Sequence, residues 1–210
     1  MRALRVPLLL FVLPAILIAG LDPLAGALVL TRTGIGAGEV WRLWTGHWVH
    51  FSGSHLGWNL GVMVMAGVGL ESRRSGSLSR YTVIVAPLIS VSLLIGQPAM
   101  NRFGGLSGLA TGVVVLLGLV LMENPGRDQR LGLGLLLLVS VKSGHDLVEP
   151  AALLSRFATL GIRPLALAHL VGAGLALVFA GISLRGTALI PAFVHDHKNE
   201  RRFTQRGSSG

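Results

Sequence analysis

Residues 6–21 read VPLLLFVLPAILIAGL, and residues 111–122 read TGVVVLLGLVLM. Neither run contains a charged side chain, and the whole chain of 210 residues is 51% hydrophobic and only 13% charged. A soluble domain of this size could not bury several runs of this length. These stretches therefore predict a protein that crosses a membrane several times.

Six apolar segments follow one another along the chain, each near the ~20 residues that a spanning helix needs. They cover residues 4–21, 55–71, 80–97, 105–122, 129–145 and 164–184. We therefore expect an all-α polytopic bundle of six transmembrane helices in one domain, residues 1–185. A polar, basic tail follows at 186–210, and its composition predicts disorder.

Two of these segments have weaker patterns. The first follows Arg2 and Arg5, as a signal peptide would, but its apolar run is long and lacks a small-x-small cleavage site, so we expect a retained span. The fifth has a short uninterrupted core, and Lys142 and Asp146 lie at its end. We expect it to span, since Lys142 could extend toward the interface.

The distribution of basic residues predicts the orientation. With the N-terminus inside, twelve basic residues lie on the cytoplasmic side and six on the other, which favours cytoplasmic N- and C-termini. The segment 22–54 then lies outside the cytoplasm, and its aromatic residues predict an interfacial position. The twelve are Arg2, Arg5, Arg73, Arg74, Arg80, Arg127, Arg130, Arg185, Lys198, Arg201, Arg202 and Arg206, and the six are Arg32, Arg42, Arg102, Lys142, Arg156 and Arg163.

Charge and cysteine content exclude several classes of function. The formal net charge is +9, but the basic residues are scattered at the ends of apolar runs, so they indicate a lipid bilayer and not nucleic acid as the partner. The chain has no cysteine, which excludes disulfides, thiolate metal sites and cysteine catalysis.

Polar side chains inside spans are costly, and they stand out at three places. His55 and Asn59 open the second segment, Ser107 opens the fourth, and His169 lies in the sixth. Because consecutive spans alternate in direction, these three segments all start at the non-cytoplasmic face. At about 1.5 Å per residue, Ser107 lies about 3 Å, Asn59 about 6 Å and His169 about 8 Å below the start of its segment. The four residues should share one layer that water reaches from outside.

Each of these residues also has a structural interpretation. The serine hydroxyl could bond to its own helix backbone, and the histidine could be a satisfied interior side chain. Gly108 and Gly112 form a small-x-x-x-small pattern that is typical of close helix packing.

Taken together, the layer predicts nucleophilic chemistry. A serine hydroxyl needs a base to take its proton, and histidine titrates at about pH 6.5, so Ser107 and His169 could form a catalytic dyad. Donors to an oxyanion could come from Asn59, His55 and the backbone N–H of Ser107. We expect no Asp or Glu at the depth of His169, so a third triad member is not predicted.

The other histidines of the segment 44–60, His47 and His50, are expected to be structural and to bond loop carbonyl groups. A zinc site would need three or four converging ligands, and the motif His-Glu-x-x-His of metalloproteases is absent from the sequence. No metal or organic cofactor is implied.

Several short motifs occur in a fixed order along residues 41–176. WR-x-x-T at 41–45 precedes HLGWN at 55–59, Glu71 closes the second segment, and GLSG at 105–108 precedes AHLVG at 168–172. This combination resembles the rhomboid family of intramembrane serine proteases. The resemblance implies a six-helix core, Ser107 as nucleophile, His169 as base, and His55 with Asn59 as oxyanion or substrate-binding residues. It implies substrates that are transmembrane proteins with a helix-destabilising cleavage region rich in glycine or small residues, cut near the periplasmic face of the bacterial inner membrane.

Within that family, the string TGHWVHF at 45–51 is similar to the rhombosortase subgroup, whose proposed substrates carry a C-terminal Gly-Gly sorting tail. The sequence also departs from the family pattern. Gly46 stands where many rhomboids have a histidine, and Tyr81 falls at the cytoplasmic end of the third segment, so His169 must be held by something other than a tyrosine ring. A rhomboid-like protein that binds helices without cutting them and a small transporter are the alternative functions.

Overall fold

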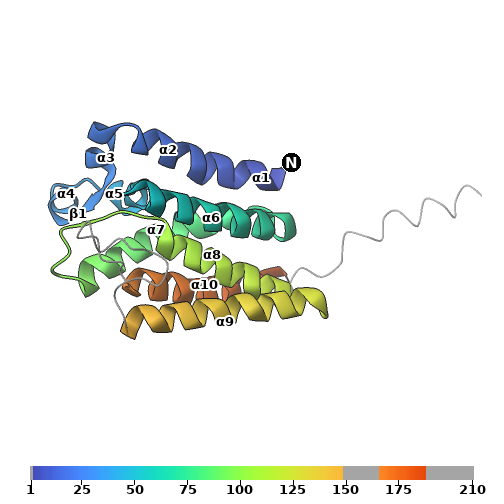
Figure 1. The fold of residues 1–210 in the computed structure, drawn as a ribbon. Coiled ribbons are helices and arrows are strands. Elements are labelled where there is room, and N and C mark those ends of the chain that lie inside the picture. Colours follow the sequence, from blue (N-terminus) through green and yellow to red (C-terminus); the bar gives the residue numbers. More distant parts are fainter. Residues whose placement is uncertain (1, 149–165, 188–210) are drawn as a thin grey trace, which may run out of the picture.

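The computed structural model describes residues 2–148 and 166–187, and in these ranges long helices lie side by side as a bundle (Figure 1). Every expected span coincides with a helix to within a few residues, which confirms the all-α polytopic architecture. The expected tail lies, from residue 188 on, outside the described residues. The first rod joins α1 (Arg2–Pro7), the π-helical turn η1 (Leu8–Val12) and α2 (Leu13–Ala19), and the others are α6 (Gly53–Arg73), α7 (Ser77–Gly96), α8 (Ser107–Met122), α9 (Arg127–Val148) and α10 (Ala166–Thr187).

The outer surface of the bundle fits a bilayer. Helices α7 and α9 and residues Ala166–Ser183 of α10 are long and apolar enough to cross a membrane, and Ala3–Ala19 and Ser107–Met122 are shorter apolar helices. Large apolar side chains point outward from these helices, with Ile95 77% and Val141 68% exposed. In water such a belt would drive association, so the chain is embedded in a membrane.

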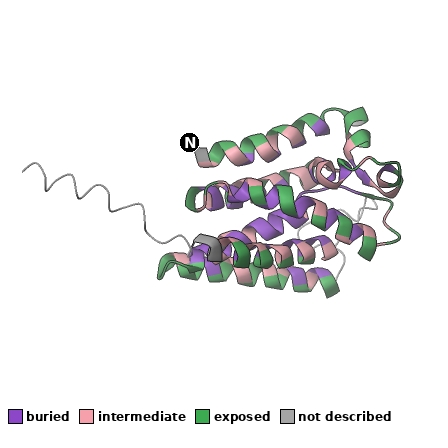
Figure 2. Cartoon of the chain, turned by 180° about the vertical axis from the view of Figure 1, so that it is seen from behind, coloured by how far each residue is buried: buried purple, intermediate pink, exposed green. Residues whose placement is uncertain are grey.

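Helix α8 forms the centre of the bundle. It packs against α6, α9 and α10, and buried residues are concentrated on the inner helices in Figure 2. Its crossing with α9 depends on two glycines, because a Cβ on Gly132 would lie 2.5 Å from the Gly118 carbonyl oxygen. Small residues at crossings are the usual means of helix association where lipid removes the hydrophobic driving force.

Residues 22–52, which we call the cap, fold into short elements at the end of the bundle opposite the N-terminus (Figure 1). They are α3 (Asp22–Leu28), β1 (Leu30–Thr31), α4 (Arg32–Gly36), α5 (Arg42–Thr45) and the 3-10 turn η2 (Gly46–Trp48). Strand β1 pairs antiparallel with β2 (Arg102–Phe103), so that Leu30 lies opposite Phe103. The sequence did not predict this ladder, since two-residue strands leave no alternating pattern.

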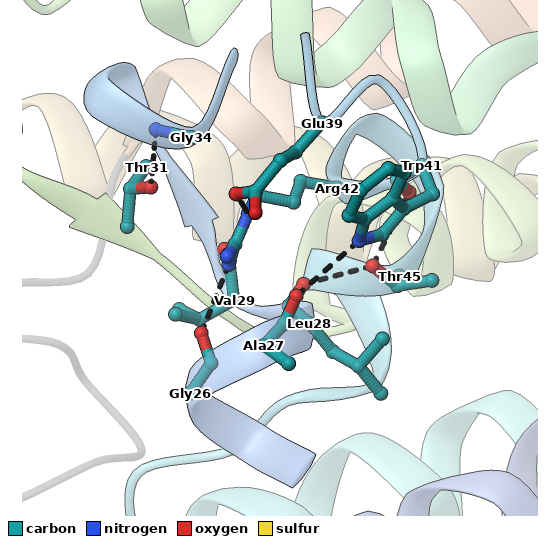
Figure 3. A network of polar contacts seen from close by, with 10 residues as sticks. All are labelled: Gly26, Ala27, Leu28, Val29, Thr31, Gly34, Glu39, Trp41, Arg42 and Thr45. Carbon is teal, nitrogen blue, oxygen red and sulfur yellow. Dashed lines mark hydrogen bonds and ion pairs between the residues drawn. The ribbon is translucent and has the colours of Figure 1, made fainter. Parts of the chain in front are cut away.

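The WR-x-x-T motif holds the cap together (Figure 3). The Arg42 guanidinium donates to the carbonyl oxygens of Gly26 and Val29 at 2.9 and 2.6 Å, and its Nε lies 2.5 Å from Glu39 Oε2. The Thr45 hydroxyl donates to the Leu28 carbonyl at 2.8 Å. The motif thus satisfies the carbonyl groups at the end of α3, which would otherwise lack partners.

Two tryptophans of the cap compensate for two prolines in the helices below. Pro14 and Pro87 have no N–H, so neither can donate to the carbonyl four residues earlier. These carbonyls belong to Leu10 and Val83. Trp48 Nε1 donates to the Leu10 oxygen at 2.7 Å, and Trp44 Nε1 donates to the Val83 oxygen at 2.9 Å.

His47 and His50 make the expected hydrogen bonds to carbonyl groups. His47 Nε2 lies 2.9 Å from the Ala86 oxygen of α7, and His50 Nδ1 lies 3.0 Å from the Trp48 oxygen. Burial lowers the pKa of each side chain from 6.5 to about 4. Both therefore stay neutral at physiological pH, and His47 fixes the cap to α7 while His50 bonds within the cap.

The pairing of tryptophan and proline predicts non-additive stabilities. Trp44→Phe should lower the stability by about 1–3 kcal/mol, because it leaves the Val83 carbonyl without a donor in apolar surroundings. In a Pro87→Ala background the loss should be smaller, since residue 87 then supplies the N–H. Thermal unfolding in detergent micelles measures both, with the lipid-facing Trp58→Phe, 61% exposed, as the control. Equal losses in the two backgrounds would contradict the pairing.

The pKa of His47 predicts a loss of stability in acid. Its folded value is below that of the unfolded chain, so the unfolded state takes up the proton first as the pH falls. Its contribution to stability should therefore decline from about pH 6.5 toward about pH 4, by about 1.4 kcal/mol per pH unit. His47→Gln keeps an N–H for Ala86 but cannot be protonated, so its melting temperature should fall less between pH 7 and pH 5. An unchanged pH dependence in this variant would contradict the assignment.

Candidate active site

Helices α8 and α10 touch through their backbones at the end of the bundle that carries the cap. A Cβ added to Gly108 would lie 2.7 Å from the Ala168 carbonyl oxygen, and one added to Gly172 would collide with the Gly108 carbonyl. Ser107 immediately precedes this contact on α8, and His169 immediately follows Ala168 on α10. The expected packing role of the Gly108 pattern is thus confirmed, and the same contact brings the two candidate residues onto abutting turns.

Ser107 is the first residue of α8, with Leu106 as its N-cap. The first intrahelical bond runs from the Ala110 N–H to the Leu106 carbonyl at 2.8 Å, so the N–H groups before it remain available to a ligand. Ser107 is half-buried. Its hydroxyl forms no hydrogen bond with any described residue, neither with its own helix nor with His169. Within the described part of the chain, the Ser107 hydroxyl therefore does not bond to the backbone of its own helix.

Two glycines, Gly104 and Gly105, precede Ser107 and determine how the chain enters α8. Gly105 has φ +136°, a conformation that strongly favours glycine. A Cβ on Gly104 would lie 2.7 Å from the Val49 carbonyl oxygen, so this loop lies directly on the cap. The Gly105 N–H also donates to the Gly46 carbonyl at 3.3 Å. The cap thereby fixes the point where α8 begins.

His55 and Asn59 lie on one face of the first turns of α6. The Ser52 hydroxyl accepts a hydrogen bond from the His55 N–H at 3.2 Å and so defines the start of the helix. Gly105 lies against both side chains, since a Cβ there would be 2.8 Å from His55 Cε1 and 3.9 Å from Asn59 Nδ2. Asn59 is 7% exposed, and its Nδ2 has no partner among the described residues. A buried amide donor thus lies against Gly105, which is two residues before Ser107.

His169 is buried and paired with a carboxylate. Its Nδ1 lies 2.7 Å from Asp146 Oδ2, and the two side chains are only 6% and 4% exposed. The expectation that no Asp or Glu lies at this depth was wrong. Lys142 completes the cluster, with Nζ 2.6 Å from the same carboxylate oxygen and 3.1 Å from His169 Nδ1.

Helix direction explains why the sequence argument missed Asp146. The layer was defined by the opening turns of the second, fourth and sixth spans, but the odd-numbered spans end at the same face. Asp146 lies in the last turn of α9 and so returns to the level at which α8 and α10 begin. The signal that could have identified it was an acidic residue at the end of an apolar segment, four residues after a lysine.

Tyr81 does not contact the His169 ring, as the sequence predicts. It comes from α7 and is fully buried, and its hydroxyl donates to the Gly172 carbonyl at 2.9 Å. Tyr81 therefore supports the backbone of α10 about one turn beyond His169, while Asp146 contacts the imidazole itself. His55 and His169 are close enough to interact electrostatically, which places both rings in the same region.

Metal binding finds no support in this cluster. Among residues 2–148 and 166–187, no group of three or more His, Cys, Asp or Glu side chains is arranged to hold a metal ion.

The family model described as Rhomboid domain matches residues 37–186, a range that includes Ser107, His169, His55 and Asn59. No curated protein matched the chain. Because the family match covers well over half of the 210 residues, the chain belongs to the rhomboid family of intramembrane serine proteases.

Proposed function

We propose that the chain is an active intramembrane serine endopeptidase in which Ser107 is the nucleophile and His169 the general base. The observation that carries the proposal is the backbone contact between Gly108 and Gly172, which holds the two residues on abutting turns of α8 and α10. A serine at a helix N-terminus beside a buried histidine has the two groups that acyl transfer requires. The hydroxyl and imidazole are not hydrogen-bonded without substrate, and such bonds often form only when substrate is present.

The reaction also needs donors for the oxyanion. Asn59 Nδ2 supports this part of the proposal, because a buried amide without a partner costs stability unless a ligand uses it. The N–H of Ser107 at the start of α8 is a second donor, favoured by the positive end of the helix dipole. His55, next to Gly105, is a third donor or a substrate-orienting group.

The substrates we propose are transmembrane proteins cut near the non-cytoplasmic face of the bacterial inner membrane. This depth follows from the predicted orientation with both termini in the cytoplasm, which puts the cap and the starts of α6, α8 and α10 on the periplasmic side. Peptide bonds in a helix are protected by hydrogen bonding, so the cleaved region should be rich in glycine or other small residues. A C-terminal Gly-Gly sorting tail of the rhombosortase type meets this requirement.

Substitution of the two reacting groups tests the activity directly. Ser107→Ala and His169→Ala should each abolish cleavage of a co-expressed substrate with a Gly-rich transmembrane segment, because neither the nucleophile nor its base can be replaced by a neighbour. A fluorophosphonate probe should label the wild type and not Ser107→Ala. Cleavage that persists in either variant, with normal accumulation in membranes, would defeat the proposal. A wild type that captures substrates but neither cleaves them nor reacts with the probe would indicate the non-catalytic alternative.

The helix crossing offers a second test with a matched control. Gly172→Ala places a methyl group against the Gly108 carbonyl, so α8 and α10 must separate and probe labelling should fall by at least 10-fold. Gly174→Ala, on the same helix, meets no atom within 4 Å and should label like the wild type. Equal labelling of both variants would show that the contact does not set the active geometry.

A further inference from the structure

The cluster around His169 contains a charge arrangement that a serine and histidine pair alone does not require. Asp146 and Lys142 come from the same face of α9, four residues apart, and both reach His169 Nδ1 on α10. Asp146 is almost fully buried, whereas the Lys142 side chain remains 32% exposed. A buried carboxylate is costly, so its position against the imidazole nitrogen demands a reason.

The proton on the imidazole decides whether His169 can act as a base. A carboxylate only accepts hydrogen bonds and an ammonium group only donates them. If Nδ1 carries the proton, it donates to Asp146, Lys142 donates to the same carboxylate, and Nε2 keeps a lone pair. If Nδ1 carries no proton, Lys142 can donate a hydrogen bond to it and Nε2 carries the proton. The Asp146 carboxylate then faces the lone pair of Nδ1 at 2.7 Å. Lys142 and Asp146 therefore favour opposite tautomers.

We propose that Asp146 is a positioning residue that holds the proton of His169 on Nδ1 against the competing donor Lys142, and so keeps Nε2 unprotonated for Ser107. The inference rests on the proposed function of Ser107 and His169, to which it adds an orienting carboxylate.

Acylation of Ser107 involves only the enzyme and its substrate. Ser107 Oγ bonds to the substrate carbonyl carbon as its proton moves to Nε2, and the carbonyl π electrons move to oxygen. The proton on Nε2 then goes to the leaving amine when the C–N bond breaks. Asp146 remains ionised throughout and stabilises the transient imidazolium.

The tautomer of His169 can be measured without an activity assay. In Ser107→Ala protein labelled with ¹⁵N-histidine in micelles, the ring nitrogens of His169, assigned by their loss in His169→Gln, should show a protonated Nδ1 and a bare Nε2 at neutral pH. Adding Asp146→Asn should move the population toward the Nε2–H form. An Nε2–H tautomer in the Ser107→Ala protein would overturn the proposal. This first spectrum needs no change at Asp146, so it decides even where Asp146→Asn fails to fold.

Kinetics give the second readout. Asp146→Asn should lower kcat by about 10²-fold or more with KM within about 2-fold, since the site still binds substrate but holds the wrong tautomer. Adding Lys142→Met to Asp146→Asn should recover about 10-fold of kcat, because the competing donor is gone, and Asp146→Glu should recover part of the activity. A purely structural salt bridge predicts no recovery when its second partner is removed.

The controls separate this inference from the proposed function. Ser140→Ala, exposed on the same helix, should leave kcat and KM unchanged. Asp146→Asn with wild-type kcat, or a double variant no faster than Asp146→Asn alone, would overturn the role of Asp146. A wild type that fluorophosphonate never labels would instead refute Ser107 as nucleophile, and the tautomer spectrum would still report whether Asp146 controls His169.

Discussion

The contact between the bare backbones of α8 and α10 at Gly108 and Gly172 determines how the rest of the site is arranged. In a bilayer, lipid is as apolar as the helix surface, so association depends on close packing. The absence of side chains at this crossing lets Ser107 and His169 share one level. Tyr81 secures the same crossing from α7 by bonding to the Gly172 carbonyl. Two helices distant in sequence are thus fixed relative to each other by atoms of the main chain.

Polar side chains at the cap end of the bundle bond to carbonyl groups of neighbouring elements. Arg42 and Thr45 bond to the end of α3. Arg32 donates to the Leu94 carbonyl in the last turn of α7 and to the Gln97 and Met100 carbonyls after it. These bonds are partly buried, where an unpaired carbonyl is costly. Asn59 Nδ2 is among the side-chain atoms of the described part of the chain that are buried without a hydrogen-bond partner. It lies against Gly105, two residues before Ser107, and this position makes the unused donor informative.

The long apolar segments made the fold predictable, because a bilayer imposes both length and composition on each span. The shared layer of His55, Asn59, Ser107 and His169 was also predictable, since helix direction alternates. Asp146 was not predicted, because the layer was defined only by the starts of the even-numbered helices. The odd-numbered helices end at the same level and also contribute side chains to it. The β1–β2 ladder and the contacts of Trp44 and Trp48 depend on three-dimensional proximity that no local pattern encodes. Sequence thus identified groups that could react but not those that orient them.

The two indole bonds of the cap have a mechanical consequence. Trp48 and Trp44 donate to Leu10 and Val83, whose carbonyls face the gaps left by Pro14 and Pro87. Lifting the cap would leave both oxygens without a donor, at a cost of about 1–3 kcal/mol each. These bonds therefore tie the cap to the first rod and to α7. Displacement of the cap must therefore break both indole bonds, whereas separation of helices that neither indole bridges leaves both bonds intact.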